Sequence, residues 1–99
     1  MNDIIKEGLA SYKLKFETIG GKLTLYENQL KFHPHSFNIQ KNIVVIDLLN
    51  IKSVTQEWNK LLGFVPIIPN ILKITLQDEC IYKFVVWERN DWINKIEKT

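Results

Sequence analysis

The feature that most constrains the fold of this chain is an alternation of apolar and polar residues in its first third. Three stretches carry the alternation: YKLKFETI, KLTLY and QLKFH. Successive side chains of a β-strand point to opposite faces, so a period of two predicts strands with one buried face. The pairs Gly20–Gly21 and Glu27–Asn28 separate these stretches and are typical of tight turns. The sequence therefore predicts a meander of three short antiparallel strands.

The rest of the chain adds four more predicted strands. The run IVVIDL is continuously apolar, which is typical of a strand with little water on either face, and NIKSVTQEW is expected to be its neighbour across a short turn. The stretches ILKITLQ and CIYKFVVW flank Asp78–Glu79 and predict a hairpin. One face of each hairpin strand is expected to carry Leu72, Ile74 and Leu76, and Tyr82, Phe84 and Val86, respectively.

Only the final segment, ERNDWINKIEK, changes period. Its residues Trp92, Ile93 and Ile96 form an apolar stripe at helical spacing, and Glu88 or Asn90 is expected to open the helix. Short antiparallel strands leave sheet edges that need closing. We therefore expect a mainly β fold, a curled or barrel-like sheet of about seven antiparallel strands with one C-terminal α-helix covering one end.

Length and composition restrict the class of protein further. A chain of 99 residues makes a single domain, spanning residues 1–99. The net charge of +2 is too small for a nucleic-acid binder, which usually shows a strong basic excess. A lone cysteine excludes an internal disulfide and fits a reducing cytosol. The stretch MNDIIKEGLASYK has no signal-peptide core, and no window reaches the ~20 apolar residues of a membrane-spanning helix.

Four longer segments point to a protein family: GGKLTLYENQLKFHPHSFNIQ, IDLLNIKSV, IPNILKITLQD and YKFVVWERNDWINKI. With them, from about Gly8 to Ile96, the chain resembles a bacterial GRAM-like domain of the pleckstrin-homology (PH) superfold. This resemblance implies a bent, seven-stranded barrel sealed by a C-terminal helix, which agrees with the strand pattern. It also implies a binding module without catalysis, which contacts membrane lipids in some members of the superfold and proteins in others.

The uncharged stretch LLGFVPIIPN, Leu61 to Asn70, is the first candidate site. Its two prolines and one glycine are unfavourable in a long helix or a central strand, so we expect a loop. Four of its large apolar side chains together represent about 6–12 kcal/mol of burial free energy, so we expect that something covers part of the loop. The candidate contact residues are Trp58, Leu61, Leu62, Phe64 and Ile67.

A group of lysines in the N-terminal half is the second candidate site, for an anionic ligand. Its members are Lys13, Lys15, Lys22 and Lys31. Lipid-binding PH domains carry lysines and arginines in the first strand, the following loop and the second strand, and the resemblance places the first three lysines there. The only arginine, Arg89, lies elsewhere, so the bidentate phosphate contact that arginine provides is not expected. The alternative reading is a solvated sheet face whose charges discourage edge pairing.

Catalytic, metal and cofactor sites are not expected. His33-Pro34-His35 offers two histidines, whereas zinc needs three or four ligands. The sequence has no Gly-rich phosphate loop and no evident nucleophile beside a base. Trp87 and Trp92 flank the helix start and are expected to anchor the core, and Cys80 is expected to be a small core residue.

The sequence thus predicts a cytoplasmic, non-catalytic binding module with no cofactor. The first hypothesis is protein association, including self-association as a homodimer, through the apolar loop from Trp58 to Pro69. The alternative is peripheral attachment to anionic lipid at the inner face of the membrane, through the same loop and the four lysines. The third reading is a loop packed over its own barrel, in a protein with no dedicated binding surface. Neither nucleic acid nor a small-molecule substrate is expected.

Overall fold

The computed structural model describes residues 3–35, 43–61 and 65–99, with their side chains outside residues 58–70. Its strands are β1 (Ile4–Lys13), β2 (Thr18–Tyr26), β3 (Gln29–Pro34), β4 (Val44–Asp47), β5 (Ile51–Leu61), β6 (Val65–Leu76) and β7 (Ile81–Val86). Its helices are η1 (Leu48–Asn50), a single 3-10 turn, and α1 (Arg89–Lys98).

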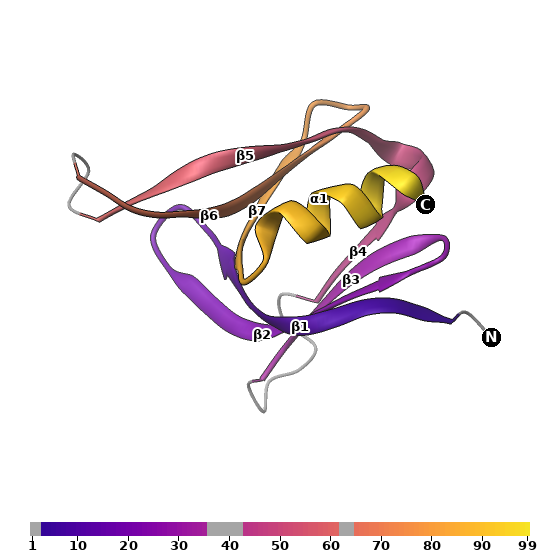
Figure 1. Ribbon diagram of the computed structural model, residues 1–99, viewed down its shortest axis with the longest axis horizontal. Coiled ribbons are helices and arrows are strands. Elements are labelled where there is room, and N and C mark those ends of the chain that lie inside the picture. The colour runs from indigo at the N-terminus through magenta and orange to yellow at the C-terminus, as the bar shows by residue number, and fades with distance from the viewer. Residues whose placement is uncertain (1–2, 36–42, 62–64) are drawn as a thin grey trace.

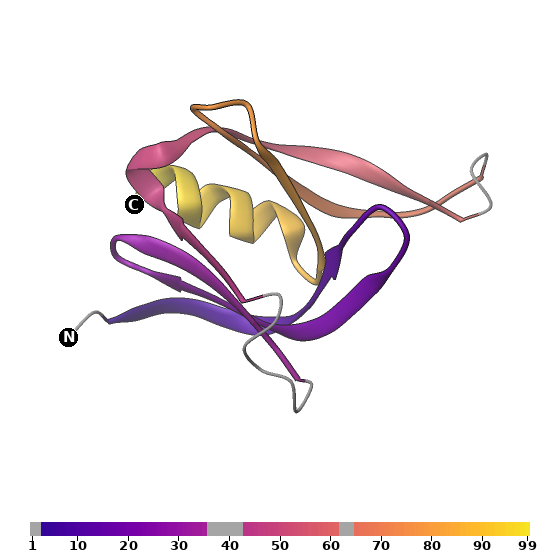
Figure 2. The same ribbon diagram turned by 180° about the vertical axis from the view of Figure 1, so that it is seen from behind.

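The seven described strands form one antiparallel sheet in the order β4-β3-β2-β1-β7-β6-β5. The sheet bends so that β1 to β4 lie on one side of α1 and β5 to β7 lie on the other (Figure 1). The view from behind shows the same arrangement, with the helix between the two halves (Figure 2). Seven antiparallel strands with one C-terminal helix are what the strand pattern predicts, and this prediction is confirmed.

The core fills the space between the two halves of the sheet and the helix. The alternating residues Leu23 and Leu25 of β2, and Leu30 and Phe32 of β3, are fully buried. The faces predicted for β6 and β7 also point into this core. Trp92 of α1 is 2% exposed, as expected of a core anchor. Each such side chain contributes about 1.5–3 kcal/mol on burial, so the helix is an integral part of the core and stabilises the fold.

The turn predicted at Gly20–Gly21 is wrong, because both glycines lie inside β2, opposite Ser11 and Ala10 of β1. A Cβ on Gly21 would lie 2.4 Å from the carbonyl oxygen of His33, so this pair marks a close approach of two strands. The turn lies earlier, between β1 and β2. Phe16, which the alternation places on the same strand face as Tyr12, lies in that turn and is 89% exposed.

The predicted pairing of IVVIDL with the next strand is also wrong. β4 and β5 lie at opposite ends of the sheet order, and η1 connects them. The side chain of Asp47 accepts a hydrogen bond from the N–H of Leu49 at 3.0 Å, which caps η1 and redirects the chain. Val45 is 56% exposed, so β4 has one wet face rather than none.

The stretch Leu61 to Asn70, expected to be a loop, belongs mostly to strands. β5 and β6 remain paired as far as Leu61 and Val65, and their ends project beyond the rest of the sheet (Figure 1). Proline is tolerated there because β6 pairs with β7 only from Ile71 to Thr75. Among the described strands, the part of β6 before Ile71 therefore pairs with β5 only. Proline has no N–H to donate, and on the unpaired side of β6 no strand hydrogen bond is lost.

The residues next to β7 correct two further expectations about the core. Trp87 is 76% exposed, because it follows the inward-facing Val86 and alternation turns it outward. Cys80 is exposed in the turn between β6 and β7. Helix α1 begins after Glu88, which has a left-handed backbone (φ 57°), so the predicted helix start is confirmed.

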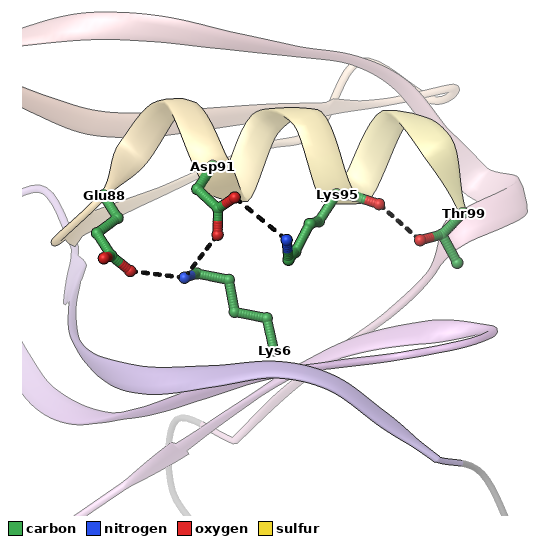
Figure 3. A network of polar contacts seen from close by, with 5 residues as sticks. All are labelled: Lys6, Glu88, Asp91, Lys95 and Thr99. Atoms are coloured by element: carbon green, nitrogen blue, oxygen red, sulfur yellow. Dashed lines mark hydrogen bonds and ion pairs between the residues drawn. The ribbon is translucent and has the colours of Figure 1, made fainter.

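A polar network fixes α1 against β1 (Figure 3). The ammonium of Lys6 lies 2.9 Å from the carboxylate of Asp91 and 2.8 Å from that of Glu88. Lys95, one turn along the helix, pairs with Asp91 at 3.2 Å. The side chain of Lys6 is 13% exposed, and its Nζ lies 5.2 Å from the centre of the Trp92 ring. Hydrogen bonds to Asp91 and then Glu88 raise the pKa of Lys6 above 10.5.

Candidate functional site

The structure separates the four candidate lysines into two pairs. Lys13 ends β1 and Lys15 lies in the turn that follows, whereas Lys22 lies in β2 and Lys31 in β3. In β2 the alternate residues Leu23 and Leu25 are buried, so Lys22 is on the outer face of the sheet. The lysines therefore belong to two candidate sites, each with its own neighbours.

The first of these is an open hollow of about 490 Å³ beside the β1–β2 turn. Its lining residues, which together with Phe16 we call the turn site, are Lys13, Leu14, Lys15, Ile81 and Lys83. Lys13 and Lys83 are direct partners in the β1–β7 ladder. Sequence reasoning missed Lys83 because only the pairing of the first and last strands brings it to the turn.

Phe16 gives the turn site an apolar tip. The turn is closed by the N–H of Leu14, which donates to the carbonyl of Glu17 at 2.8 Å. The ring of Phe16 projects into solvent, and the Nζ of Lys15 lies 5.4 Å from its centre. Ile81 is half exposed beside the same hollow. The site therefore combines exposed apolar surface with lysine side chains.

The positive charge of the turn site is only partly balanced. Lys83 pairs with Glu57 of β5 at 2.8 Å. Within the described part of the chain, no ion pair involves Lys13 or Lys15. Glu17 follows Phe16 and reduces the local charge, so the net excess is small.

The second candidate is a hollow of about 350 Å³ on the outer face of β1, β2 and β3. Its lining residues, which we call the sheet-face site, are Ile4, Glu7, Lys22, Thr24, Tyr26, Lys31 and His33. Lys22 pairs with Glu7 at 3.4 Å. The site therefore mixes lysines, hydroxyls and one carboxylate on a surface of a bent sheet.

An apolar hollow of about 280 Å³ lies on the outer side of β1 and β7. Its exposed rim is Leu9, 64% exposed, and Trp87, and its floor includes Gly20, which has no side chain to fill it. We call it the Trp87 hollow. Sequence reasoning missed it because Trp87 was expected inside the core.

The apolar contact residues predicted from the sequence lie outside what the structure describes. This holds for Leu62 and Phe64 entirely, and for the side chains of Trp58, Leu61 and Ile67, whose backbone belongs to β5 and β6. Their part in binding therefore stays a prediction.

The two histidines of His33-Pro34-His35 serve different hollows. His33 lines the sheet-face site, and His35 lies beside Gly20 in the Trp87 hollow. Among the described residues, no three His, Cys, Asp or Glu side chains come together as metal ligands would. The exposed Cys80 thiol lies beside Asp78, whose hydrogen bond and charge raise the pKa of the thiol.

Comparison with known proteins adds evidence on the fold. No protein-family model matches the sequence, and no curated protein matches it. Solved structures do match: the C-terminal domain of an unknown protein from Leishmania infantum superposes with a TM-score of 0.76 at 11% identity, over 95% of this chain and 79% of that one.

Two other matched structures contain PH domains. The C-terminal PH domain of human pleckstrin matches with a TM-score of 0.71 at 22% identity, over 98% of this chain and 87% of that domain. The DH/PH domains of p115-RhoGEF match with a TM-score of 0.71 at 13% identity, and this chain spans 30% of their length. These likenesses show that the chain has a PH-like fold. None of the described helices is long and apolar enough to cross a bilayer.

Proposed function

We propose that the chain is a non-catalytic binding module that attaches reversibly to anionic membrane surfaces through its turn site. The observation that carries the proposal is the exposed ring of Phe16, which Lys15 contacts, next to a hollow that Lys13, Lys15 and Lys83 line. An apolar tip can enter the headgroup region while lysines meet anionic lipid. The PH-like fold supports a binding role, since several matched structures are PH domains.

The expected attachment is weak and depends on salt. A lysine near an anionic bilayer contributes about 1 kcal/mol, and burying a phenylalanine ring contributes at most about 1.5–3 kcal/mol. Glu17 and the Lys83–Glu57 ion pair reduce the charge contribution. These amounts suit reversible binding better than permanent anchoring.

Selective recognition of one lipid headgroup is not part of the proposal. Arg89 is 8% exposed, and its two terminal nitrogens donate to the carbonyl of Glu57 and the side chain of Gln56, so its guanidinium is buried within the fold. The lysines that remain act as point charges without the fork geometry of arginine. We expect the module to respond to surface charge rather than to a headgroup pattern.

Vesicle co-sedimentation tests the proposal with vesicles of phosphatidylcholine, with and without phosphatidylserine. The wild-type protein is expected to pellet with the anionic vesicles at low salt and to be released by added salt. Phe16→Ser and Lys15→Gln should each reduce pelleting severalfold. Leu49→Ser, at a leucine that is 90% exposed on η1, is the matched control and should pellet like the wild type. Equal pelleting with neutral vesicles, or none at low salt, would falsify the proposal.

A second candidate function is protein association. The observation that favours it is the Trp87 hollow, since an exposed tryptophan beside an exposed leucine is typical of contact surfaces. The apolar residues from Trp58 to Ile67 would add a second contact, as the sequence predicts. The GRAM-like assignment within the PH fold and a cytoplasmic location at the inner membrane face likewise stay predictions.

A further inference from the structure

Five of the residues that line the sheet-face site lie in two adjacent rows that cross three strands. One row is Glu7, Thr24 and Lys31; the next holds Lys22 and His33, with Leu9 at its end outside the site. Lys22 and Lys31 are therefore diagonal neighbours, with backbones roughly 7–8 Å apart. Two lysine side chains at this spacing can reach a single small anion between them.

Thr24 forms the floor of the site. It is 6% exposed although it lies on the outer face of the sheet, so longer side chains around it must cover it. Its hydroxyl forms a long hydrogen bond of 3.5 Å to the carboxylate of Glu7. The same carboxylate holds the ammonium of Lys22 at 3.4 Å. The hollow of about 350 Å³ is thus a defined pocket with a polar floor.

The charges around this pocket favour an anion. Glu7 offsets one of the two ammonium groups, and no carboxylate of the described residues forms an ion pair with Lys31. His33 lies directly opposite Lys22 and offers a ring N–H, and Tyr26 adds a phenolic hydroxyl to the lining. Two lysines interact more strongly with a phosphate monoester, whose charge at neutral pH is about −1.5 to −2, than with a singly charged diester.

We propose that the sheet-face site binds the phosphate monoester group of a small soluble molecule. The volume of the hollow is at the low end of ligand pockets and suits a molecule the size of a sugar phosphate. Thr24 lies six residues along β2 from Thr18, where the strand begins after the β1–β2 turn. This row is therefore ~20 Å from that turn. A membrane that meets Phe16 is therefore ~20 Å from Thr24 along the strand, which favours a soluble ligand. This choice of a soluble ligand rests on the proposed membrane contact at Phe16, whereas the pocket and its charges do not.

The test is an NMR titration of the ¹⁵N-labelled full chain with glycerol 3-phosphate. The amides of residues 22–24 and 31–33 are expected to shift along saturable curves, with a Kd on the order of 1 mM. Lys31→Gln should weaken binding about three- to tenfold, since it removes a charged donor from a partly exposed site. Lys98→Gln, an equal loss of charge at the exposed end of α1, should leave Kd unchanged.

A gain of affinity gives the sharper test. Glu7→Gln removes the carboxylate that opposes an anion, so it should tighten binding about threefold or more. Glu97→Gln, the same change on the exposed face of α1, should not. An unfolded variant cannot mimic this gain, and a spectrum that keeps its dispersion confirms the fold of each protein.

Two further titrations distinguish the sources of the phosphate. Glycerophosphocholine, a diester, should shift the same amides less, and phosphatidic acid vesicles should shift them no more than phosphatidylserine vesicles of equal surface charge do. The proposal is overturned if glycerol 3-phosphate shifts no amide in these two segments, or if Glu7→Gln binds no more tightly. Shifts caused only by the phosphatidic acid vesicles would overturn it in favour of a lipid headgroup.

Discussion

Gly20 and Gly21 are adjacent in β2, yet a methyl group at the two positions would meet different surroundings. At Gly20 the nearest heavy atom is the His35 ring, 3.9 Å from an added Cβ. At Gly21 the carbonyl oxygen of His33 lies at 2.4 Å and the Phe32 ring at 2.6 Å. A backbone atom cannot move aside as the end of a side chain can. The close packing of β2 on β3, which also builds the sheet-face site, therefore depends on one glycine.

Gly21→Ala is expected to destabilise the fold by about 2–3 kcal/mol, because the methyl group overpacks the β2–β3 contact. Gly20→Ala should change the free energy of unfolding by no more than about 0.5–1 kcal/mol, because the added methyl group meets only an ordinary contact and the unfolded chain becomes less flexible. Urea denaturation of both variants measures the difference. Equal effects at the two positions would show that the strands can separate without cost.

At the scale of elements, the docking of α1 on β1 combines apolar burial with one charged network. Trp92 and Ile96 enter the core, and Lys6 lies over the Trp92 ring. The ammonium of Lys6 also contacts Asp91 and Glu88 (Figure 3). Hydrogen bonds from Lys6 and then Lys95 lower the pKa of Asp91 below 3.8. An acid with a lowered pKa stabilises the fold above its unfolded pKa, and that stability is lost as the pH falls through the lowered value.

Asp91→Asn should therefore be less stable than the wild type at pH 7, and the difference in stability should shrink as the pH falls below 3.8. The measurement is the free energy of urea unfolding across this pH range. Glu97→Gln provides the control, because Glu97 is exposed on the same helix. A difference between wild type and Asp91→Asn that persists unchanged at low pH would point to lost packing rather than to the carboxylate.

For the whole molecule, alternation in the sequence predicted the strands and their buried faces, because one side of each strand must leave water. Leu23, Leu25 and Phe32 are where that pattern puts them. Long-range pairing decided the features that the pattern missed. From the sequence alone Gly21 suggests a turn, and only the pairing of β2 with β3 explains why a glycine is needed there. Likewise Lys83 suggests an ordinary solvated lysine, and only the pairing of β7 with β1 brings it to the turn site. Trp87 was expected in the core because it is large and apolar, but its position directly after the buried Val86 turns it outward.

The same whole-molecule view separates the two apolar surfaces that could support association. The Trp87 hollow lies on the outer side of β1 and β7, whereas the apolar stretch belongs to the projecting ends of β5 and β6 (Figure 1). Sedimentation velocity over a concentration series tells them apart.

If the Trp87 hollow mediates self-association, Trp87→Ser should raise the dimer Kd about 30-fold, as expected when a tryptophan anchor worth about 2 kcal/mol is lost. Phe64→Asp should then have little effect, and the reverse result would assign association to the β5–β6 end. A wild-type protein that stays monomeric at every concentration would exclude self-association through either surface.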